Sequence, residues 1–187
     1  MKTDNKSVCP VELAGGLDNG LRRFLQNPHR ILAPYIRKDM TVLDLGCGPG
    51  FFTIEMGRML HGSGQVVAAD LQQGMLDKVA DKIKGTILEN TIKLHKCQED
   101  RIGLAEKVDF ILAFFMVHEV PDHDKLFAEV KTLLKQGGRM LIIEPKFHVS
   151  KESFNRMMEI INKHGFNFNS AKNSVPFTLV PSEYFPG

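Results

Sequence analysis

Short apolar runs recur along the chain and alternate with segments in which apolar residues return every three or four positions. The short runs predict buried strands, and the amphipathic segments predict helices. The predicted strands cover residues 41–45, 65–70, 92–95, 108–115 and 139–144, and the predicted helices cover 51–60, 73–84, 124–135 and 150–164. Strands that alternate with helices are typical of an α/β three-layer sandwich with a mainly parallel sheet. Phe166–Ser170 and Phe177–Val180 predict two further strands joined as a hairpin.

The length and composition predict a single domain over residues 1–187. A chain of 187 residues with 43% hydrophobic content can bury one sizeable core. We expect residues 1–33 to be an amino-terminal cover segment and residues 34–187 to form the core. Asn27-Pro28 predicts the start of a short helix within the cover segment.

A glycine-rich turn joins the first predicted strand to the helix that follows it. The turn reads Asp44-Leu45-Gly46-Cys47-Gly48-Pro49-Gly50. Glycines permit positive φ and close approach of a ligand, and open α/β sheets bind cofactors at this end of their strands. A P-loop requires Gly-Lys-Ser/Thr, which does not follow. A dinucleotide fingerprint requires a small residue where this chain has Phe51, so the spacing disfavours both of these sites.

The acid two positions before the first glycine, followed by three alternating glycines, resembles a known motif. It is similar to the first motif of the class I S-adenosylmethionine-dependent methyltransferases, D/E-x-G-x-G-x-G, with Asp44, Gly46, Gly48 and Gly50 at the matching positions. The resemblance covers roughly residues 30–181. It implies a Rossmann-like, mostly parallel, seven-stranded sheet with an antiparallel last strand. It also implies S-adenosyl-L-methionine as cofactor and S-adenosyl-L-homocysteine as product.

Within that family the chain resembles the small-molecule branch, which includes quinone-biosynthesis and arsenite methyltransferases. The resemblance implies cofactor contacts from Cys47, in the glycine turn, and from Phe114, at the end of the fourth strand. The arsenite enzymes depend on several cysteines, whereas only Cys9 and Cys97 are otherwise present here, which disfavours that subtype. The expected function is methyl transfer from S-adenosylmethionine to an unidentified small-molecule acceptor.

Asp70 ends the second predicted strand, 20 residues after Gly50. At this spacing an α/β nucleotide site places a carboxylate beside a ribose, where it can accept hydrogen bonds from both hydroxyls. The alternative is a capping residue for the helix over residues 73–84. Leu71 follows and would offer an apolar face to adenine.

The third strand is followed by Gln98, Glu99 and Asp100 at the same end of the sheet. The resemblance implies that one side chain here accepts a hydrogen bond from the adenine amino group. Counting back from the tripeptide Ile102-Gly103-Leu104 places Gln98 in that role, and a shifted register places Glu99 or Asp100 there. Solvated surface charge is the alternative for the two acids.

His118 and Glu119 follow the fourth strand at the edge where the transferable methyl group should lie. Histidine suits proton removal near neutral pH. Two adjacent residues on an extended loop point in different directions, so we expect at most one to face the acceptor. The other would orient a backbone amide or cap the next helix, and a structural role for His118 is also open.

A loop at Val11–Gly20 has glycines that would let it close over a ligand, and family members fold their amino termini over the cofactor. It is either such a lid or a flexible lead-in. On the resemblance, a nicotinamide-dependent oxidoreductase and a non-catalytic partner subunit remain the alternatives to an enzyme that transfers methyl groups.

Charge, hydrophobic runs and cysteine content limit the classes of partner and the location that we expect. The 24 basic and 22 acidic residues nearly cancel, which argues against a nucleic-acid partner. Neither a membrane span nor a secretory leader is predicted, so we expect a cytoplasmic protein. Three widely spaced cysteines predict free thiols and no metal site. The sequence predicts no oligomeric state.

Overall fold

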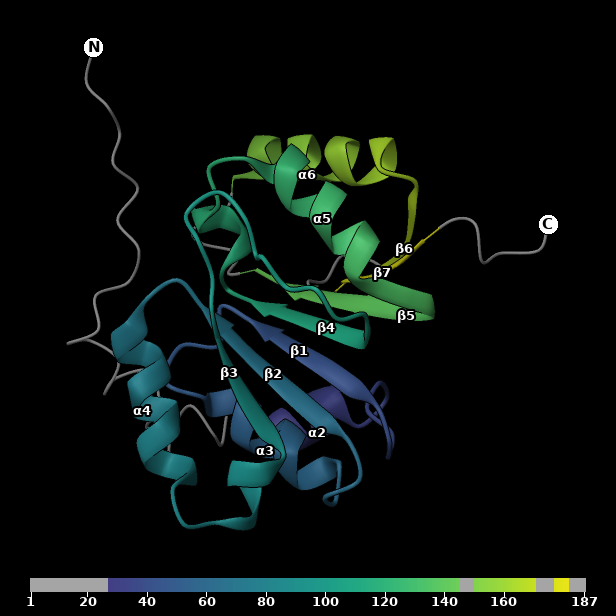
Figure 1. Cartoon of the computed structure of the whole chain (residues 1–187). Helices are drawn as coiled ribbons and strands as arrows, with labels where there is room; N and C mark the ends of the chain where they lie inside the picture. The colour runs from purple at the N-terminus through teal and green to yellow at the C-terminus, as the bar shows by residue number, and fades with distance from the viewer. Residues whose placement is uncertain (1–26, 145–149, 171–176, 182–187) are drawn as a thin grey trace.

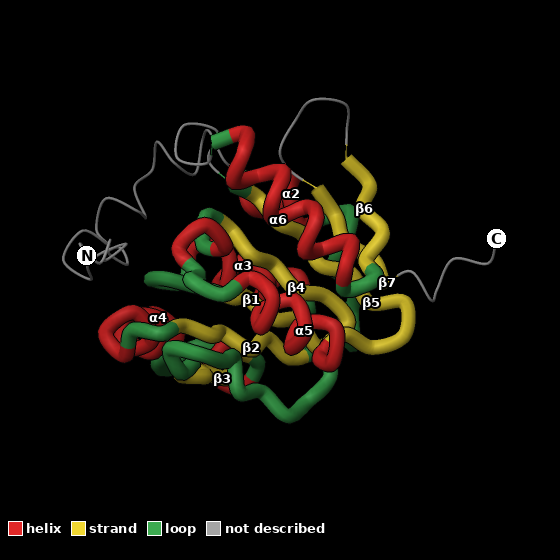
Figure 2. Tube along the Cα trace, turned by 90° about the horizontal axis from the view of Figure 1, so that it is seen from above, coloured by secondary structure: helices red, strands yellow, loops and turns green. Residues whose placement is uncertain are grey.

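The computed structural model describes residues 27–144, 150–170 and 177–181. Within these ranges the strands form one seven-stranded sheet in the order β3-β2-β1-β4-β5-β7-β6, visible as a continuous row of strands in Figure 2. The strands are β1 (Thr41–Leu45), β2 (Gln65–Asp70), β3 (Ile92–Lys96), β4 (Val108–Phe114), β5 (Leu134–Ile143), β6 (Phe166–Ser170) and β7 (Phe177–Pro181). The pairs among β1 to β5 are parallel, whereas β7 pairs antiparallel with both β5 and β6. The expected α/β Rossmann-like fold with a mainly parallel sheet is confirmed.

Helices cover both faces of this sheet (Figure 1). The α-helices are α2 (Pro28–Leu32), α3 (Phe51–Met59), α4 (Gln73–Ile83), α5 (His123–Leu133) and α6 (Lys151–Lys163), and the 3-10 helices are η2 (Ile87–Asn90) and η3 (Val117–Glu119). One hydrophobic cluster joins the sheet to α5 and α6, and a second joins it to α2, α3 and α4. Neighbouring strand residues alternate between the clusters: Val42 belongs to the second and Leu43 to the first. Both faces are therefore buried, which explains the nearly continuous apolar strands.

The expected boundary between the fourth long helix and strand five is wrong. The pattern predicts a helix to Lys135 stopped by Gly137-Gly138, but α5 ends at Leu133 and β5 begins at Leu134. The glycines instead lie within β5, where its pairing with β4 shifts register between Val108 and Phe110. Gly137 has a φ of 72°. Glycine at such a φ is typical of a bulge, which explains why the pair interrupts a strand here and does not end a helix.

Part of the amino-terminal cover segment is described. Pro28 begins α2, and Asn27 caps it by accepting the Arg30 N–H (3.1 Å). Leu32 is fully buried in the cluster with α3. His29 Nδ1 also hydrogen bonds Glu55 Oε1 of α3 at 2.8 Å, so α2 is fixed against α3. The predicted lid at Val11–Gly20 lies outside the described residues.

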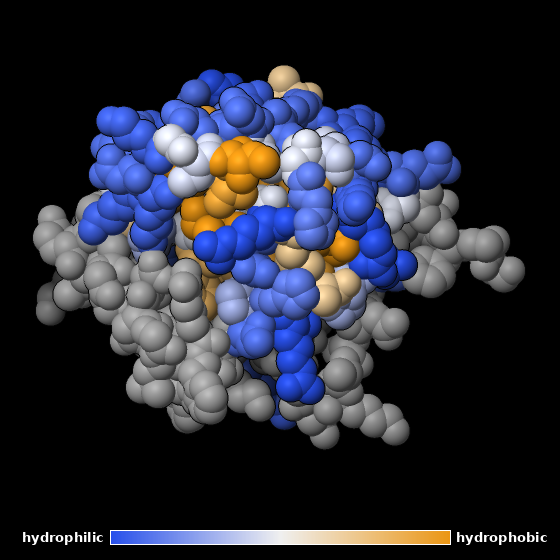
Figure 3. All heavy atoms as spheres, turned by 90° about the horizontal axis from the view of Figure 1, so that it is seen from below, coloured by the Kyte–Doolittle hydropathy of each residue, from blue (hydrophilic) through white to orange (hydrophobic). Residues whose placement is uncertain are grey.

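Among the described residues, the surface seen from below is mainly hydrophilic, with hydrophobic atoms gathered in a small central area (Figure 3). In the described ranges, every helix is too short or too polar to cross a bilayer.

Candidate functional site

The carboxyl ends of the parallel strands meet at one edge of the sheet. β1 lies between β2 and β4 in the sheet. After β1 the chain first forms β2 and β3 on one side of β1, and then forms β4 on the other side. The N–H groups of Gly46 and Cys47 both donate to the Ala69 carbonyl, at 2.9 and 3.0 Å, which joins the loop to the end of β2. This is the topological switch point, where open α/β sheets bind their ligands.

All three glycines of the loop have positive φ: 71° at Gly46, 53° at Gly48 and 87° at Gly50. Gly50 is the N-cap of α3. A Cβ at Gly46 would lie 2.8 Å from Met116 Cβ, whereas a Cβ at Gly48 would meet no atom within 4 Å. The loop therefore packs tightly against the segment after β4 at Gly46 and has open space at Gly48.

Asp70 is 8% exposed and binds the glycine loop directly. Its Oδ2 accepts the Gly48 N–H (2.9 Å), and its Oδ1 accepts the Gln72 N–H (2.8 Å). Burial raises the pKa of this carboxyl group, and the backbone N–H donors oppose that rise. The N-cap position of α4 belongs to Gln72. Each Asp70 oxygen has a second lone pair, so both can still accept a hydroxyl hydrogen.

The residues beside Asp70 give this edge an apolar border. Leu71 is 36% exposed, one of two large apolar side chains that are exposed in the described part of the chain. The Phe114 ring, at the end of β4, packs against Phe52 of α3 with centroids 4.4 Å apart and against Phe115 at 4.2 Å. Phe115 has a φ of 57°, so the chain leaves β4 in a left-handed backbone conformation that residues other than glycine rarely adopt.

Asp44 is buried beneath the glycine loop. Its Oδ2 accepts the Thr53 hydroxyl (2.6 Å), which ties the end of β1 to the first turn of α3. Burial raises the Asp44 pKa to about 7, the Thr53 hydrogen bond opposes the rise, and the Asp70 charge adds to it. Cys47 is also buried, and burial raises the pKa of its thiol well above the usual value. Cys47 is therefore a protonated, poorly reactive thiol near neutral pH.

The raised pKa of Asp44 predicts a pH-dependent stability. Because the folded-state pKa of about 7 exceeds the ordinary aspartate value of 3.8, the folded protein holds this proton more tightly. The stabilisation is complete below about pH 4 and is lost as pH rises through 7. We expect Asp44→Asn to abolish this loss, on the order of 2–4 kcal/mol of unfolding free energy. Urea unfolding of the wild type and of Asp44→Asn at pH 4.5 and 8 measures this change. If the two proteins differ in unfolding free energy by the same amount at both pH values, the prediction is contradicted.

The residues expected at the adenine end lie on the surface. Gln98 and Glu99 are exposed, and Gln98 Oε1 accepts from Arg101 Nε (2.8 Å). The segment after β3 is joined to the site because the Cys97 N–H donates to the Asp70 carbonyl at 2.9 Å. Both candidates therefore follow β3 at the same edge of the sheet as Asp70.

Glu129 of α5 holds the same segment from its other end, and the sequence analysis missed it. Its carboxylate oxygens accept the N–H groups of Ile102 (2.8 Å) and Gly103 (2.7 Å). An acid on a solvated helix face gives no sequence signal for such a contact.

His118 and Glu119 lie in η3, so the expected extended loop is wrong. His118 Nδ1 hydrogen bonds Glu144 Oε2, and Glu144 Oε1 accepts the Val117 N–H at 2.8 Å. Burial raises the pKa of Glu119. Neither residue caps the next helix, because Asp122 caps α5 by accepting the Lys125 N–H at 3.0 Å.

Glu144 is the main residue that the sequence analysis missed. It is 3% exposed and directly follows β5. The available signal was an acid at the end of an otherwise apolar strand, at the same edge as Asp70.

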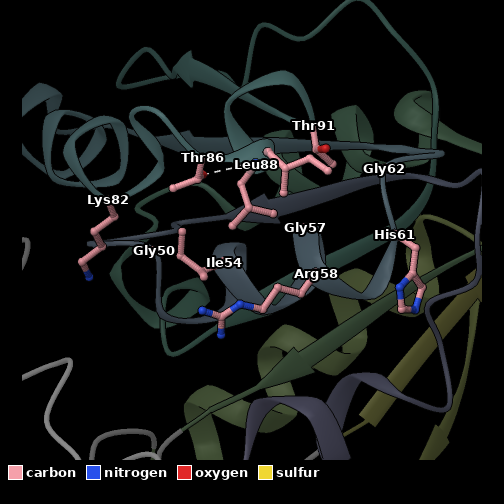
Figure 4. A pocket seen from close by; sticks show the side chains of 11 residues that line it. Gly50, Ile54, Gly57, Arg58, His61, Gly62, Lys82, Thr86, Leu88 and Thr91 are labelled. Atoms are coloured by element: carbon pink, nitrogen blue, oxygen red, sulfur yellow. Dashed lines mark hydrogen bonds between the residues drawn. The ribbon is translucent and has the colours of Figure 1, made fainter.

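A separate cavity of about 770 Å³ lies between α3, α4 and η2 (Figure 4). It shares Gly50 with the glycine loop but contains none of the other predicted site residues. Lys82, on its wall, donates from Nζ to the Pro49 carbonyl at 2.7 Å and so ties α4 to the loop. Arg58 and His61 also line it.

Comparison with known proteins assigns the family. The family model described as "Methyltransferase domain" matches residues 42–138, more than half of the chain. The chain belongs to the methyltransferase domain family. This confirms the family predicted from the glycine motif, and the methyltransferase match spans the strands and loops described above.

Individual relatives agree with this methyltransferase assignment. "Ubiquinone/menaquinone biosynthesis C-methyltransferase UbiE" of Haemophilus ducreyi is 31% identical over 133 residues, which cover 71% of this chain and 50% of that protein. "Demethylmenaquinone methyltransferase" of Lactobacillus johnsonii is 35% identical over 105 residues, covering 54% and 42%. The chain spans about half the length of the curated relatives it matches. A solved "SAM dependent methyltransferase" from Aquifex aeolicus has 26% identity and a TM-score of 0.79, with 92% and 97% of the two chains covered.

The methyltransferase site fits S-adenosylmethionine on three observations. The space at Gly48 leaves the loop open to a ligand. Asp70, with spare lone pairs, suits the ribose hydroxyls. Leu71 offers an exposed apolar surface to a flat base.

Proposed function

We propose that this methyltransferase moves the methyl group of S-adenosyl-L-methionine to a ring carbon of a quinol-type small molecule. The single observation that carries the proposal is the Asp70 carboxylate bonded to the Gly48 N–H at the switch point of the sheet. The acceptor class comes from relatives named for ubiquinone and menaquinone biosynthesis. Because the chain spans about half of their length, both the activity and the acceptor are proposals.

Each cofactor residue receives a role from its position. Asp70 would accept hydrogen bonds from the ribose, and Leu71 would pack on the adenine. Gln98 or Glu99 would accept from the adenine amino group. The cofactor supplies an electrophilic methyl group on its sulfonium sulfur.

The methionine end would lie over the glycine loop. Gly46, Gly48 and Gly50, with Cys47, would shape the loop surface there, and Asp44 would hold it in place through Thr53. Phe114 would border this end and exclude water. The protein's contribution is to align donor and acceptor in a dry site.

The acceptor would lie beside η3. A quinol ring carbon becomes nucleophilic when a ring hydroxyl loses its proton, and His118 would take that proton. Glu119, half-buried with a pKa that burial raises, would lie beside a second ring oxygen. We propose no catalytic metal.

The alternatives are not favoured. A nicotinamide oxidoreductase is opposed by Phe51 at the dinucleotide position and by the family match. A non-catalytic subunit gains no support, because the loop, its carboxylate and η3 are all in contact at one edge.

The test of function is release of S-adenosylhomocysteine by the purified chain. Reduced 1,4-naphthoquinone is the first acceptor, and simple phenols, thiols and amines form the comparison panel. Mass spectrometry of the product should place the new methyl group on a ring carbon. Methylation confined to oxygen, nitrogen or sulfur would overturn the acceptor class, and an absence of S-adenosylmethionine binding in calorimetry would overturn the function.

Replacement of Asp70 should weaken cofactor binding selectively. Asp70→Asn removes the charge and one of the two carboxylate oxygens that accept backbone N–H groups, so we expect the dissociation constant of S-adenosylhomocysteine to rise roughly 10- to 100-fold. Asp77→Asn, at an exposed position of α4, is the charge-matched control and should leave binding unchanged. Calorimetry measures both, and equal binding by the two variants would remove Asp70 from the site.

A further inference from the structure

Glu144 has no role in the proposed function so far, yet it is the most buried of the acidic residues that contact η3. It is 3% exposed and directly follows β5. One carboxylate oxygen accepts the Val117 N–H at 2.8 Å, and the other hydrogen bonds His118 Nδ1. A buried carboxylate requires such partners, because isolated burial of its charge is very unfavourable. Through these two contacts, Glu144 joins the adjacent residues Val117 and His118 of η3 to the end of β5.

Other contacts fix the same turn from different directions. His123 Nε2 of α5 hydrogen bonds the Val117 carbonyl at 2.9 Å, and the Phe115 N–H donates to the Ile143 carbonyl at 2.8 Å. Met116 packs against Gly46, where even a Cβ would not fit. The backbone that precedes His118 is thus held, and Glu144 also binds the His118 side chain.

We propose that Glu144 is a positioning residue that orients His118 as the base toward the methyl acceptor. The proposal rests on the proposed function. A carboxylate at Nδ1 favours the tautomer with hydrogen on Nδ1, because only that tautomer donates to it. In the neutral ring, Nε2 then carries the lone pair that accepts a proton.

The charge of Glu144 also makes His118 a stronger base. An adjacent carboxylate stabilises the imidazolium ion. Among the described residues, the titratable groups near this turn include Glu119 in η3, Glu144 after β5, Asp70 at the end of β2 and His123 of α5. Asp70 and Glu119 interact electrostatically, and Glu119 interacts with both His118 and Glu144. Of these carboxylates, Glu144 is the one hydrogen bonded to the ring.

The proton balance is simple. The hydroxyl O–H bond of the acceptor breaks, its electron pair stays on the acceptor, and His118 Nε2 binds the proton with its own lone pair. The Nδ1 hydrogen stays in the hydrogen bond to Glu144. After methylation the methylated ring carbon releases its hydrogen as a proton to water, and the ring oxygen regains a proton from the imidazolium, so that the aromatic quinol forms again and one proton is released overall.

The test compares Glu144→Gln with the wild-type chain by NMR titration of the histidine ring protons, in protein without cofactor. The His118 signal is assigned with His118→Gln. We expect the His118 pKa to fall by about 1 unit or more in Glu144→Gln, since a neighbouring opposite charge shifts a pKa by 1–3 units. Glu152→Gln, whose side chain is 86% exposed on α6, removes the same charge and should leave His118 unchanged.

Kinetics supply a second measurement. In Glu144→Gln the pH midpoint of kcat should fall by the same amount as the His118 pKa, turnover should fall about tenfold, and the S-adenosylhomocysteine dissociation constant should stay within about twofold. Glu144→Asp keeps the charge and should restore most of the His118 shift. If Glu144→Gln does not fold, the same titration on Glu144→Asp decides: a His118 pKa near that of free histidine would overturn the proposal.

An unmoved His118 signal in folded Glu144→Gln would also overturn the positioning role. Failure of the proposed function would look different: the wild-type chain would not bind S-adenosylmethionine, while the NMR titration would still report on the pair.

Discussion

Replacing Gly46 by alanine is expected to disrupt the glycine loop and lower the unfolding free energy by about 2–4 kcal/mol. The new Cβ would lie 2.8 Å from Met116 Cβ and 2.9 Å from its Cγ, and φ at this position is 71°. Met116 is held by η3 and β4, so it has little freedom to move away. Cofactor binding should be lost together with stability, as measured by urea unfolding and calorimetry.

Gly48→Ala is the matched control for this prediction. Its φ of 53° carries a similar backbone cost, but the added Cβ meets no atom within 4 Å. We therefore expect only about 1–2 kcal/mol of lost stability, from the left-handed conformation, together with a clear loss of cofactor affinity because the Cβ enters the open space. Equal destabilisation by the two substitutions would show that the Met116 contact is unimportant.

Replacing His118 by glutamine should lower turnover roughly 10²-fold for an acceptor that must lose a proton. Glutamine can still hydrogen bond to Glu144 but cannot take up a proton at neutral pH. Cofactor affinity should stay nearly unchanged, which distinguishes a base from a residue that supports the loop. Rates of S-adenosylhomocysteine release and calorimetry measure the two quantities.

His29→Gln is the control for His118→Gln, because His29 lies on α2 and its side chain is 66% exposed. It should leave turnover unchanged. A parallel loss of cofactor binding and turnover in His118→Gln would indicate a structural role, and full turnover would show that alignment alone carries the reaction.

The glycine loop and Asp70 could be predicted because each depends on a local pattern. Positive φ at Gly46 and Gly48 requires glycine at fixed spacing, and an acid at the end of a buried strand is visible in the sequence. The alternation of strand and helix likewise places these residues at one edge of the sheet without knowledge of their contacts.

The contacts of Glu144 and Glu129 could not be predicted, because their partners lie 26 to 27 residues away in the chain. Such contacts depend on the register between separate elements, which spacing alone does not determine. The bulge at Gly137 is similar: a glycine pair ends many helices, and only its pairing with β4 shows that it belongs to a strand.

The position of β1 between β2 and β4 divides the site along the chain. Every residue proposed to contact the ribose or adenine comes before residue 100, while the proposed base and its partner come after residue 115. Under the proposed roles, mutations could therefore change acceptor preference without altering nucleoside recognition. Met116 against Gly46 is a tight contact between the two halves, so exchanges between relatives should keep this pair together. Under the proposed roles, the residues that hold the methyl donor are thus separate along the chain from those that select the acceptor.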